Sequence, residues 1–209
     1  MRVGRFTGTA RQKRGQSHGL PVALMGRVVE DLVEAYALIS SEGRLTSLRP
    51  SSDVDHKDFI FDERGGYRNV YLQVKGVTQT NVLGQVRMHV SYPVGTVLSN
   101  RRFLYLFCLL DVSLMRITRM WLIPSPDFNR LAPKPKAKPG RVDLAFVAGA
   151  RSKWDRYLVT AEQLGLRLVK VVEKSPGTPL MSLTAYASMV MGIKPNATAR
   201  RRPTRSAQG

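Results

Sequence analysis

The feature that most constrains the fold is an uninterrupted apolar run from Phe103 to Leu110. A short continuous apolar run of this kind is typical of a strand that is buried on both faces. It is too short for a membrane span, which needs roughly 18 or more apolar residues. We therefore expect Phe103 to Leu110 to form the buried central strand of a sheet. The single cysteine, Cys108, lies inside this run and is expected to be a reduced, apolar core residue.

Other strand patterns lie on both sides of this run. Residues 58–61 and 70–75 are separated by a turn at 62–66, where paired glycines supply the positive φ angles that a tight reversal needs. The predicted strands are 45–48, 58–61, 70–75, 85–92, 101–110, 117–123 and 142–147. We expect 101–110 and 117–123 to form an antiparallel pair.

An amphipathic helix is predicted at residues 21–41, and we expect Gly43 to end it as the residue after its cap. Its apolar residues recur at intervals of three and four, namely Met25, Val29, Leu32, Tyr36 and Ile39. Further along, the sequence predicts a short helix near 161–165, a helix or strand at 166–172, and a weaker helix at 180–191.

The chain is strongly basic, with 33 Lys and Arg against 15 Asp and Glu and a net charge of +18. Such an excess favours association with polyanions, because the release of counterions from phosphates stabilises binding. We therefore expect a nucleic-acid partner and no membrane. Residues 1–19 and 193–209 hold part of this charge, and we interpret them as a disordered basic arm and tail around one domain at 20–192. No signal-peptide pattern opens the chain, which predicts a cytoplasmic protein.

Polar side chains mark the strand at 70–75. Alternation places Gln73 and Lys75 on one face of that strand and Val74 on the other. A register that sets Asp58 beside Gln73 would join a carboxylate, an amide and an ammonium group at a sheet edge. Asp53 and Asp55 compete with Asp58 for the acidic position, which we assign to Asp58 because it directly precedes an alternating strand.

The predicted helix contributes further carboxylates. Glu30 and Glu34 lie one turn apart beside the apolar stripe, where a carboxylate is either solvated or able to reach the sheet edge. His56 lies in the acidic loop near the predicted site, whereas His89 falls in an alternating strand and is interpreted as structural.

These motifs resemble the PD-(D/E)xK nuclease superfamily, in particular small prokaryotic domains with a Gln-x-Lys variant. The matching elements are Gly26 through Glu30, Asp53 through Asp58, and Gln73-Val74-Lys75, and the likeness extends over roughly residues 20–172. The resemblance implies an α/β fold with a restriction-endonuclease-like core. In that core, a mixed central sheet follows the helix carrying Glu30, and further helices cover the other face.

The resemblance also implies a chemistry, that of an Mg²⁺-dependent endonuclease which hydrolyses DNA phosphodiester bonds and also accepts Mn²⁺. Asp58, the Gln73 side chain and the Val74 backbone carbonyl would hold the cation, helped by Glu30. Lys75 would orient or help deprotonate a water molecule and offset charge in the transition state. Gln73 stands where an acidic residue is more common, which lowers the negative charge of the site.

Two alternative functions follow from the same features. One is a nuclease-fold module that binds nucleic acid but no longer cleaves it, and the other is a basic RNA-associated protein in which the Gln-x-Lys motif is coincidental. Nucleases of this superfamily often act as dimers, so a homodimer is among the partners that the resemblance implies.

Overall fold

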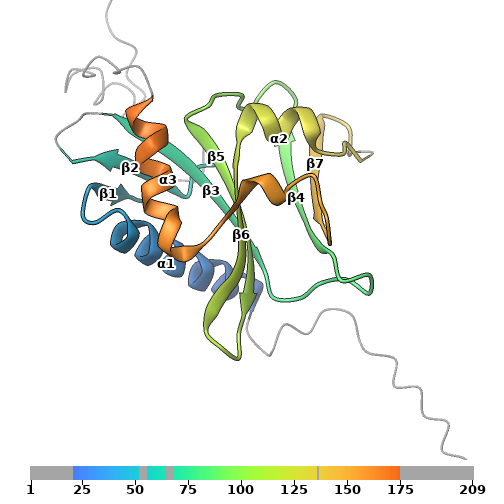
Figure 1. The fold of residues 1–209 in the computed structure, drawn as a ribbon. Coiled ribbons are helices and arrows are strands. Elements are labelled where there is room, and N and C mark those ends of the chain that lie inside the picture. The colour runs from blue at the N-terminus through green and yellow to red at the C-terminus, as the bar shows by residue number, and fades with distance from the viewer. Residues whose placement is uncertain (1–20, 52–55, 65–67, 136, 175–209) are drawn as a thin grey trace, which may run out of the picture. The chain divides into compact units, whose positions relative to one another are not determined.

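The computed structural model describes residues 21–51, 56–64, 68–135 and 137–174. Its centre is a six-stranded sheet in the order β1-β2-β3-β5-β6-β8 (Figure 1). The strands are β1 (Leu45–Leu48), β2 (Phe59–Glu63), β3 (Asn69–Val77), β5 (Phe103–Asp111), β6 (Arg116–Pro124) and β8 (Leu158–Val159). β3 and β5 are parallel, and the other neighbouring pairs are antiparallel. The predicted antiparallel pairing of the strands now seen as β5 and β6 is confirmed.

Different layers cover the two faces of this sheet. Helices α1 (Val22–Ser40) and α3 (Ala161–Glu173) pack together on one face. A separate antiparallel pair, β4 (Val86–Pro93) and β7 (Arg141–Ala148), covers the other face together with α2 (Ser125–Leu131). The predicted class, α/β with a mixed central sheet flanked by helices, is confirmed. The expectation that helices would cover the second face is largely wrong, because the two-stranded ribbon formed by β4 and β7 covers most of it.

The ribbon can cover a sheet because β4 has a period of two. Val86, Met88, Val90 and Tyr92 are buried, while the residues between them point away from the core and are more exposed. Such alternation gives a strand one apolar face, which packs against an apolar face of another sheet. The second layer is therefore built by β-strand alternation and not by a helical stripe.

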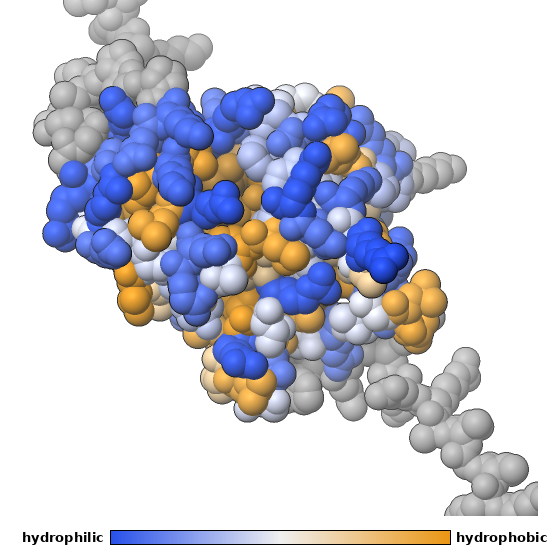
Figure 2. Space-filling model, viewed as in Figure 1, coloured by the Kyte–Doolittle hydropathy of each residue, from blue (hydrophilic) through white to orange (hydrophobic). Residues whose placement is uncertain are grey.

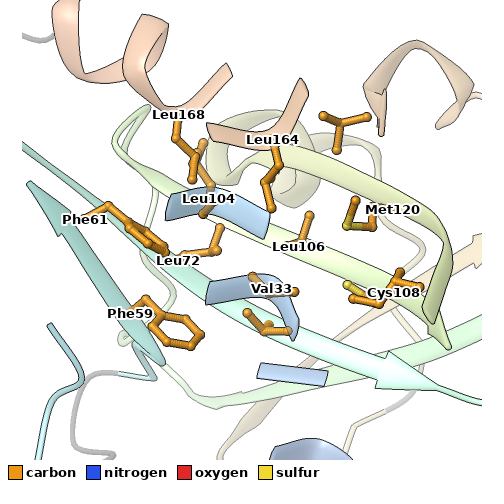
Figure 3. Packing of buried hydrophobic residues seen from close by; sticks show 14 of the residues in the cluster. Val33, Phe59, Phe61, Leu72, Leu104, Leu106, Cys108, Met120, Leu164 and Leu168 are labelled. Atoms are coloured by element: carbon orange, nitrogen blue, oxygen red, sulfur yellow. The ribbon is translucent and has the colours of Figure 1, made fainter. Parts of the chain in front are cut away.

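β5 is the buried centre that the apolar run predicts. Leu104, Leu106 and Cys108 face α1 and α3, as Figure 3 shows, and belong to the hydrophobic core between these helices and the sheet. Phe103, Tyr105 and Phe107 face the ribbon and form the opposite cluster. Burial raises the pKa of the Cys108 thiol, so this cysteine stays protonated and acts as an apolar residue.

The buried stripe of α1 is rotated from the predicted one. Met25 and Val29 are buried as expected, but the stripe continues through Val33 and Ala37. Ile39, which the prediction placed in the stripe, is 77% exposed. At Ala37 the stripe meets α3, because Gly165 of that helix lies against the Ala37 carbonyl.

The contact between α1 and α3 is a backbone contact at Gly165. Its N–H donates to Ser40 Oγ at 2.7 Å. A Cβ atom at position 165 would lie 2.3 Å from the carbonyl oxygen of Ala37 and 2.3 Å from the amide nitrogen of Ser41. Glycine is therefore the residue that allows this helix crossing.

The ends of the elements differ in detail from the prediction. α1 is capped by Ser41, and Glu42 takes the first left-handed position, with φ 55°, ahead of Gly43 with φ 75°. The segments predicted at 161–165 and 166–172 form one continuous helix, α3. α2 was not predicted, because it is a short helix that begins at the Ser-Pro step after β6.

The basic arm at 1–19, the helix at 180–191 and the tail at 193–209 lie outside the described residues, so those assignments stay predictions. Within the described residues, no helix is long and apolar enough to cross a membrane. On the face shown in Figure 2, hydrophilic residues predominate and exposed apolar residues form separate patches.

Candidate functional site

The predicted site lies where β3 runs past the end of β2. The last β2–β3 pair in the register is Phe59 with Leu72, so Asp58 comes to lie opposite Gln73. The Asp58 N–H donates to the Leu72 carbonyl at 2.9 Å. Its carboxylate Oδ2 accepts a hydrogen bond from the Val74 N–H at 2.5 Å. The register that the sequence argument required for Asp58 is the one that the structure contains.

The backbone of Val74 faces the same side as the Asp58 carboxylate. Successive residues of a strand turn their N–H and C=O groups to alternate sides, and both groups of one residue point the same way. The Val74 N–H points to Asp58, whereas the Tyr71 N–H points to the β5 side and donates to the Arg102 carbonyl at 2.7 Å. The Val74 carbonyl therefore lies on the side of β3 that carries Asp58, beyond the end of β2.

Gln73 points into the core beneath the ribbon. It is only 4% exposed, and its Oε1 accepts a hydrogen bond of 2.5 Å from the Tyr92 hydroxyl. The Tyr92 hydroxyl also contacts the Tyr105 hydroxyl at 2.8 Å. The sequence argument placed Gln73 at an open sheet edge, whereas the structure covers it with β4. An amide oxygen has two acceptor sites, so the Tyr92 bond leaves Oε1 one more.

Glu30 reaches the same region from α1. Burial and then the negative charge of Asp58 raise its pKa, while the positive charges of Arg49, Arg27 and Lys75 lower it. Arg49 Nη1 lies 4.0 Å from Glu30 Oε2. Two carboxylates that destabilise each other's charge in a half-buried place fit a site for a bound cation.

A close approach of α1 to β3 sets the position of Glu30. The preceding residue, Val29, packs directly on Gly76, where a Cβ atom would lie 2.7 Å from Val29 Cγ2. The missing side chain at position 76 lets this turn of α1 lie against the strand that carries Val74 and Lys75. The resemblance gave this glycine no role.

Glu34 takes a different role from Glu30. It accepts hydrogen bonds from Ser47 Oγ at 2.5 Å and from Arg49 Nε at 3.0 Å. Burial opposes its ionisation, but the hydrogen bonds from Ser47 and Arg49 lower the pKa of Glu34 overall. Glu34 therefore fastens α1 to β1 and the residues after it, and Glu30 is the helix carboxylate that faces Asp58 and Lys75.

Lys75 is half-buried on β3, two residues beyond Gln73. It lies close enough to Glu30 for its charge to lower the pKa of that carboxyl. Asp53 and Asp55 lie outside the described residues, so their competition with Asp58 is not decided by a direct comparison. The bonds of Asp58 to β3 nonetheless make it the described aspartate that belongs to this site.

Three further residues surround the predicted set. Tyr92 and Tyr105 were not singled out from the sequence, although burial of Tyr92 follows from the alternation of β4. His56 has a φ of 54°, and its ring packs against that of Tyr92 in a T-shaped arrangement, with 4.9 Å between the ring centroids. His89, by contrast, is exposed on β4.

The predicted donor set consists of oxygen atoms. It comprises the carboxylates of Asp58 and Glu30, the Val74 carbonyl and the Gln73 amide oxygen. The described ranges contain no group of three or more His, Cys, Asp and Glu side chains that could hold a metal. Mg²⁺ prefers oxygen ligands, keeps several of its waters and is commonly bound by one or two carboxylates, so these residues fit it.

No protein-family model and no curated protein sequence matches the chain. Among solved structures, the chain is similar to a bacterial homing endonuclease, I-Ssp6803I, with a TM-score of 0.48 and 16% sequence identity. The similarity covers 74% of this chain and 98% of the endonuclease chain.

Proposed function

We propose that the protein is an Mg²⁺-dependent endonuclease that hydrolyses DNA phosphodiester bonds and also accepts Mn²⁺. The observation that carries this proposal is the bond between the Asp58 carboxylate and the Val74 N–H. It fixes a carboxylate where β3 runs past the end of β2, next to the carbonyl of Val74, the residue that directly precedes Lys75. Glu30 completes this arrangement from α1.

In this proposal Asp58, Glu30, the Val74 carbonyl and the Gln73 amide oxygen would hold the cation. A bound Mg²⁺ supplies Lewis-acid polarisation of a phosphate oxygen and a more acidic water molecule. The Val74 N–H stabilises the ionised form of Asp58, because a hydrogen bond to a carboxylate favours its charge. The Lys75 ammonium orients the attacking water by hydrogen bonding and offsets negative charge that develops on the phosphate.

The charge of the chain supports a nucleic-acid substrate. A net charge of +18 attracts a polyphosphate backbone without reading its sequence. The burial of Gln73, which is 4% exposed, favours a second candidate, a nuclease-fold module that binds DNA without cleaving it. An RNA-associated protein is the third candidate, and the same experiment separates all three.

The test uses the full chain with supercoiled plasmid and single-stranded RNA, in Mg²⁺, in Mn²⁺ and in EDTA. We expect metal-dependent nicking or linearisation of the plasmid. Lys75→Ala should slow cleavage by at least about 100-fold, the low end for loss of a group that transfers or positions a proton. An exposed lysine on α3, Lys170, serves as the matched control. α3 ends near the start of β3, where Glu173 accepts hydrogen bonds from Arg44 and Arg68. Lys75 lies towards the other end of that strand, so Lys170 is remote from the candidate site.

Lys170→Ala removes the same charge and should cleave like the wild type. Equal cleavage by Lys75→Ala and the wild type would refute the catalytic assignment. Plasmid that is retarded in a gel but left intact in both metals would instead establish the binding module. Retention of RNA alone would establish the RNA-associated protein.

A further inference from the structure

Three buried polar groups form a hydrogen-bonded chain beneath the candidate site. The hydroxyls of Tyr105 and Tyr92 lie 2.8 Å apart, and the Tyr92 hydroxyl lies 2.5 Å from Gln73 Oε1. Tyr105 is 0%, Tyr92 1% and Gln73 4% exposed. The three residues come from β5, β4 and β3, so the chain joins the ribbon to the central sheet.

The direction of this chain follows from the number of protons. A tyrosine hydroxyl has one hydrogen to donate, and Tyr92 donates it to Gln73 Oε1. In the contact between the two hydroxyls Tyr105 must therefore be the donor. Burial raises the pKa of Tyr105 to about 12, which keeps its hydroxyl protonated at neutral pH. The amide group of Gln73 is consequently held with its oxygen towards Tyr92.

We propose that Tyr92 is a positioning residue, whose hydroxyl, held by Tyr105, fixes the orientation of the Gln73 amide on the strand position opposite Asp58. A glutamine side chain has three rotatable bonds, and without this bond its amide could turn over and present its NH₂ group instead. An NH₂ group carries only donors and cannot ligate a cation. The hydroxyl chain thus selects the amide orientation that a cation site requires. This inference rests on the proposed function where it treats Gln73 as a cation donor.

Packing around Tyr92 supports a positioning role. The His56 ring packs against the Tyr92 ring in a T-shaped arrangement, with 4.9 Å between centroids. On the other side, Tyr105 packs its own ring on Phe128, with 4.6 Å between centroids. Each of the two phenol rings is therefore packed against another aromatic ring, which restricts the position of its hydroxyl. Groups that orient a metal-binding side chain typically change metal affinity by about 10–100-fold when they are removed.

The test compares Tyr92→Phe with the wild type by two measurements. The first is the ¹⁵N–¹H spectrum of the metal-free protein, in which the side-chain amide signals of Gln73 are identified by their loss in Gln73→Ala. The second is the dissociation constant for Mn²⁺, measured by calorimetry. Tyr36, which packs on the other core from α1, provides the matched control variant Tyr36→Phe.

We expect Tyr92→Phe to shift or broaden the Gln73 amide signals and to weaken Mn²⁺ binding about tenfold. Tyr105→Phe should act in the same direction but less strongly, because Tyr92 can still donate to Gln73. In a Gln73→Ala background, Tyr92→Phe should change Mn²⁺ affinity no further. Tyr36→Phe should leave both measurements unchanged.

Unaltered Gln73 signals in Tyr92→Phe would overturn the positioning role. So would Mn²⁺ affinities that fall by the same factor whether or not Gln73 is present, since Tyr92 would then act independently of it. A wild-type protein that binds no Mn²⁺ would refute the proposed function, while a shift of the Gln73 signals would still support the orientation of its amide. The two failures are therefore distinguishable.

Discussion

The contact between Gly165 and the backbone of α1 gives a prediction whose sign opposes helix propensity. In an exposed helix, Gly→Ala stabilises by about 1 kcal/mol. Here the added Cβ would lie 2.3 Å from backbone atoms of Ala37 and Ser41, which cannot rotate away. Overpacking costs about 1–3 kcal/mol, and moving α3 outward also weakens the bond to Ser40, a loss of about 1 kcal/mol. We expect Gly165→Ala to lower the free energy of unfolding by about 2 kcal/mol.

Urea unfolding followed by tryptophan fluorescence measures this change, because Trp121 and Trp154 are both fully buried. With a slope of about 2 kcal/mol per molar urea, the midpoint should fall by about 1 M. Gly26→Ala in α1 is the matched control, since a Cβ there would meet nothing within 4 Å. It should raise the midpoint by up to about 0.5 M. If Gly165→Ala proves as stable as the wild type, or if both variants shift the same way, the close-packing argument is refuted.

The remaining predictions concern the two carboxylates of α1. Burial and Asp58 raise the pKa of Glu30, so the contribution of this carboxyl to the stability of the metal-free protein is fully present below its unfolded-state pKa of 4.5 and is lost as pH rises through the raised pKa. Glu30→Gln should reduce this loss of stability with rising pH and raise the melting temperature at pH 7. It should also reduce the stabilisation by added Mg²⁺. An identical dependence of stability on pH in the variant and the wild type would contradict this prediction. Glu34→Gln should lower stability by about 2 kcal/mol, because it weakens charge-assisted bonds to Ser47 and Arg49. Its cleavage rate per folded molecule should match the wild type, and a rate as low as that of Lys75→Ala would contradict the structural role.

β1 to β7 could be predicted from the sequence, whereas the two-residue strand β8 was not predicted. The apolar run of β5 has the length of a strand and is short for a helix, and the alternation of β3 matches a period of two. α1 is different, since Leu32 and Val33 are both apolar and either could lie on the buried stripe. The structure buries Val33, on the same stripe as Ala37 one turn later, where α3 packs closely. That choice depends on a partner more than 120 residues away, Gly165, whose N–H is bonded to Ser40 125 positions earlier.

The position of Asp58 opposite Gln73 could also be predicted, because it depends on a local strand pair. The surroundings of Gln73 could not. Alternation places Gln73 on one face of β3, but it does not say what covers that face. The expected helices would have left the amide at an edge, whereas the ribbon brings Tyr92 over it. β4 belongs to a different sheet from β3, so no pattern within either strand reveals their contact.

The separations along the chain at Asp58 and at Gly165 have a consequence for the order of folding. The Asp58–Val74 bond spans 16 residues, and its strands are neighbours in sequence. The bond between Ser40 and Gly165 spans 125 residues, so its loop costs more entropy to close. On a ribosome, β2 and β3 emerge and can pair while α3 is still unsynthesised. The carboxylate thus reaches its place on β3 early, and the helix that carries Glu30 is locked only when the last described helix arrives.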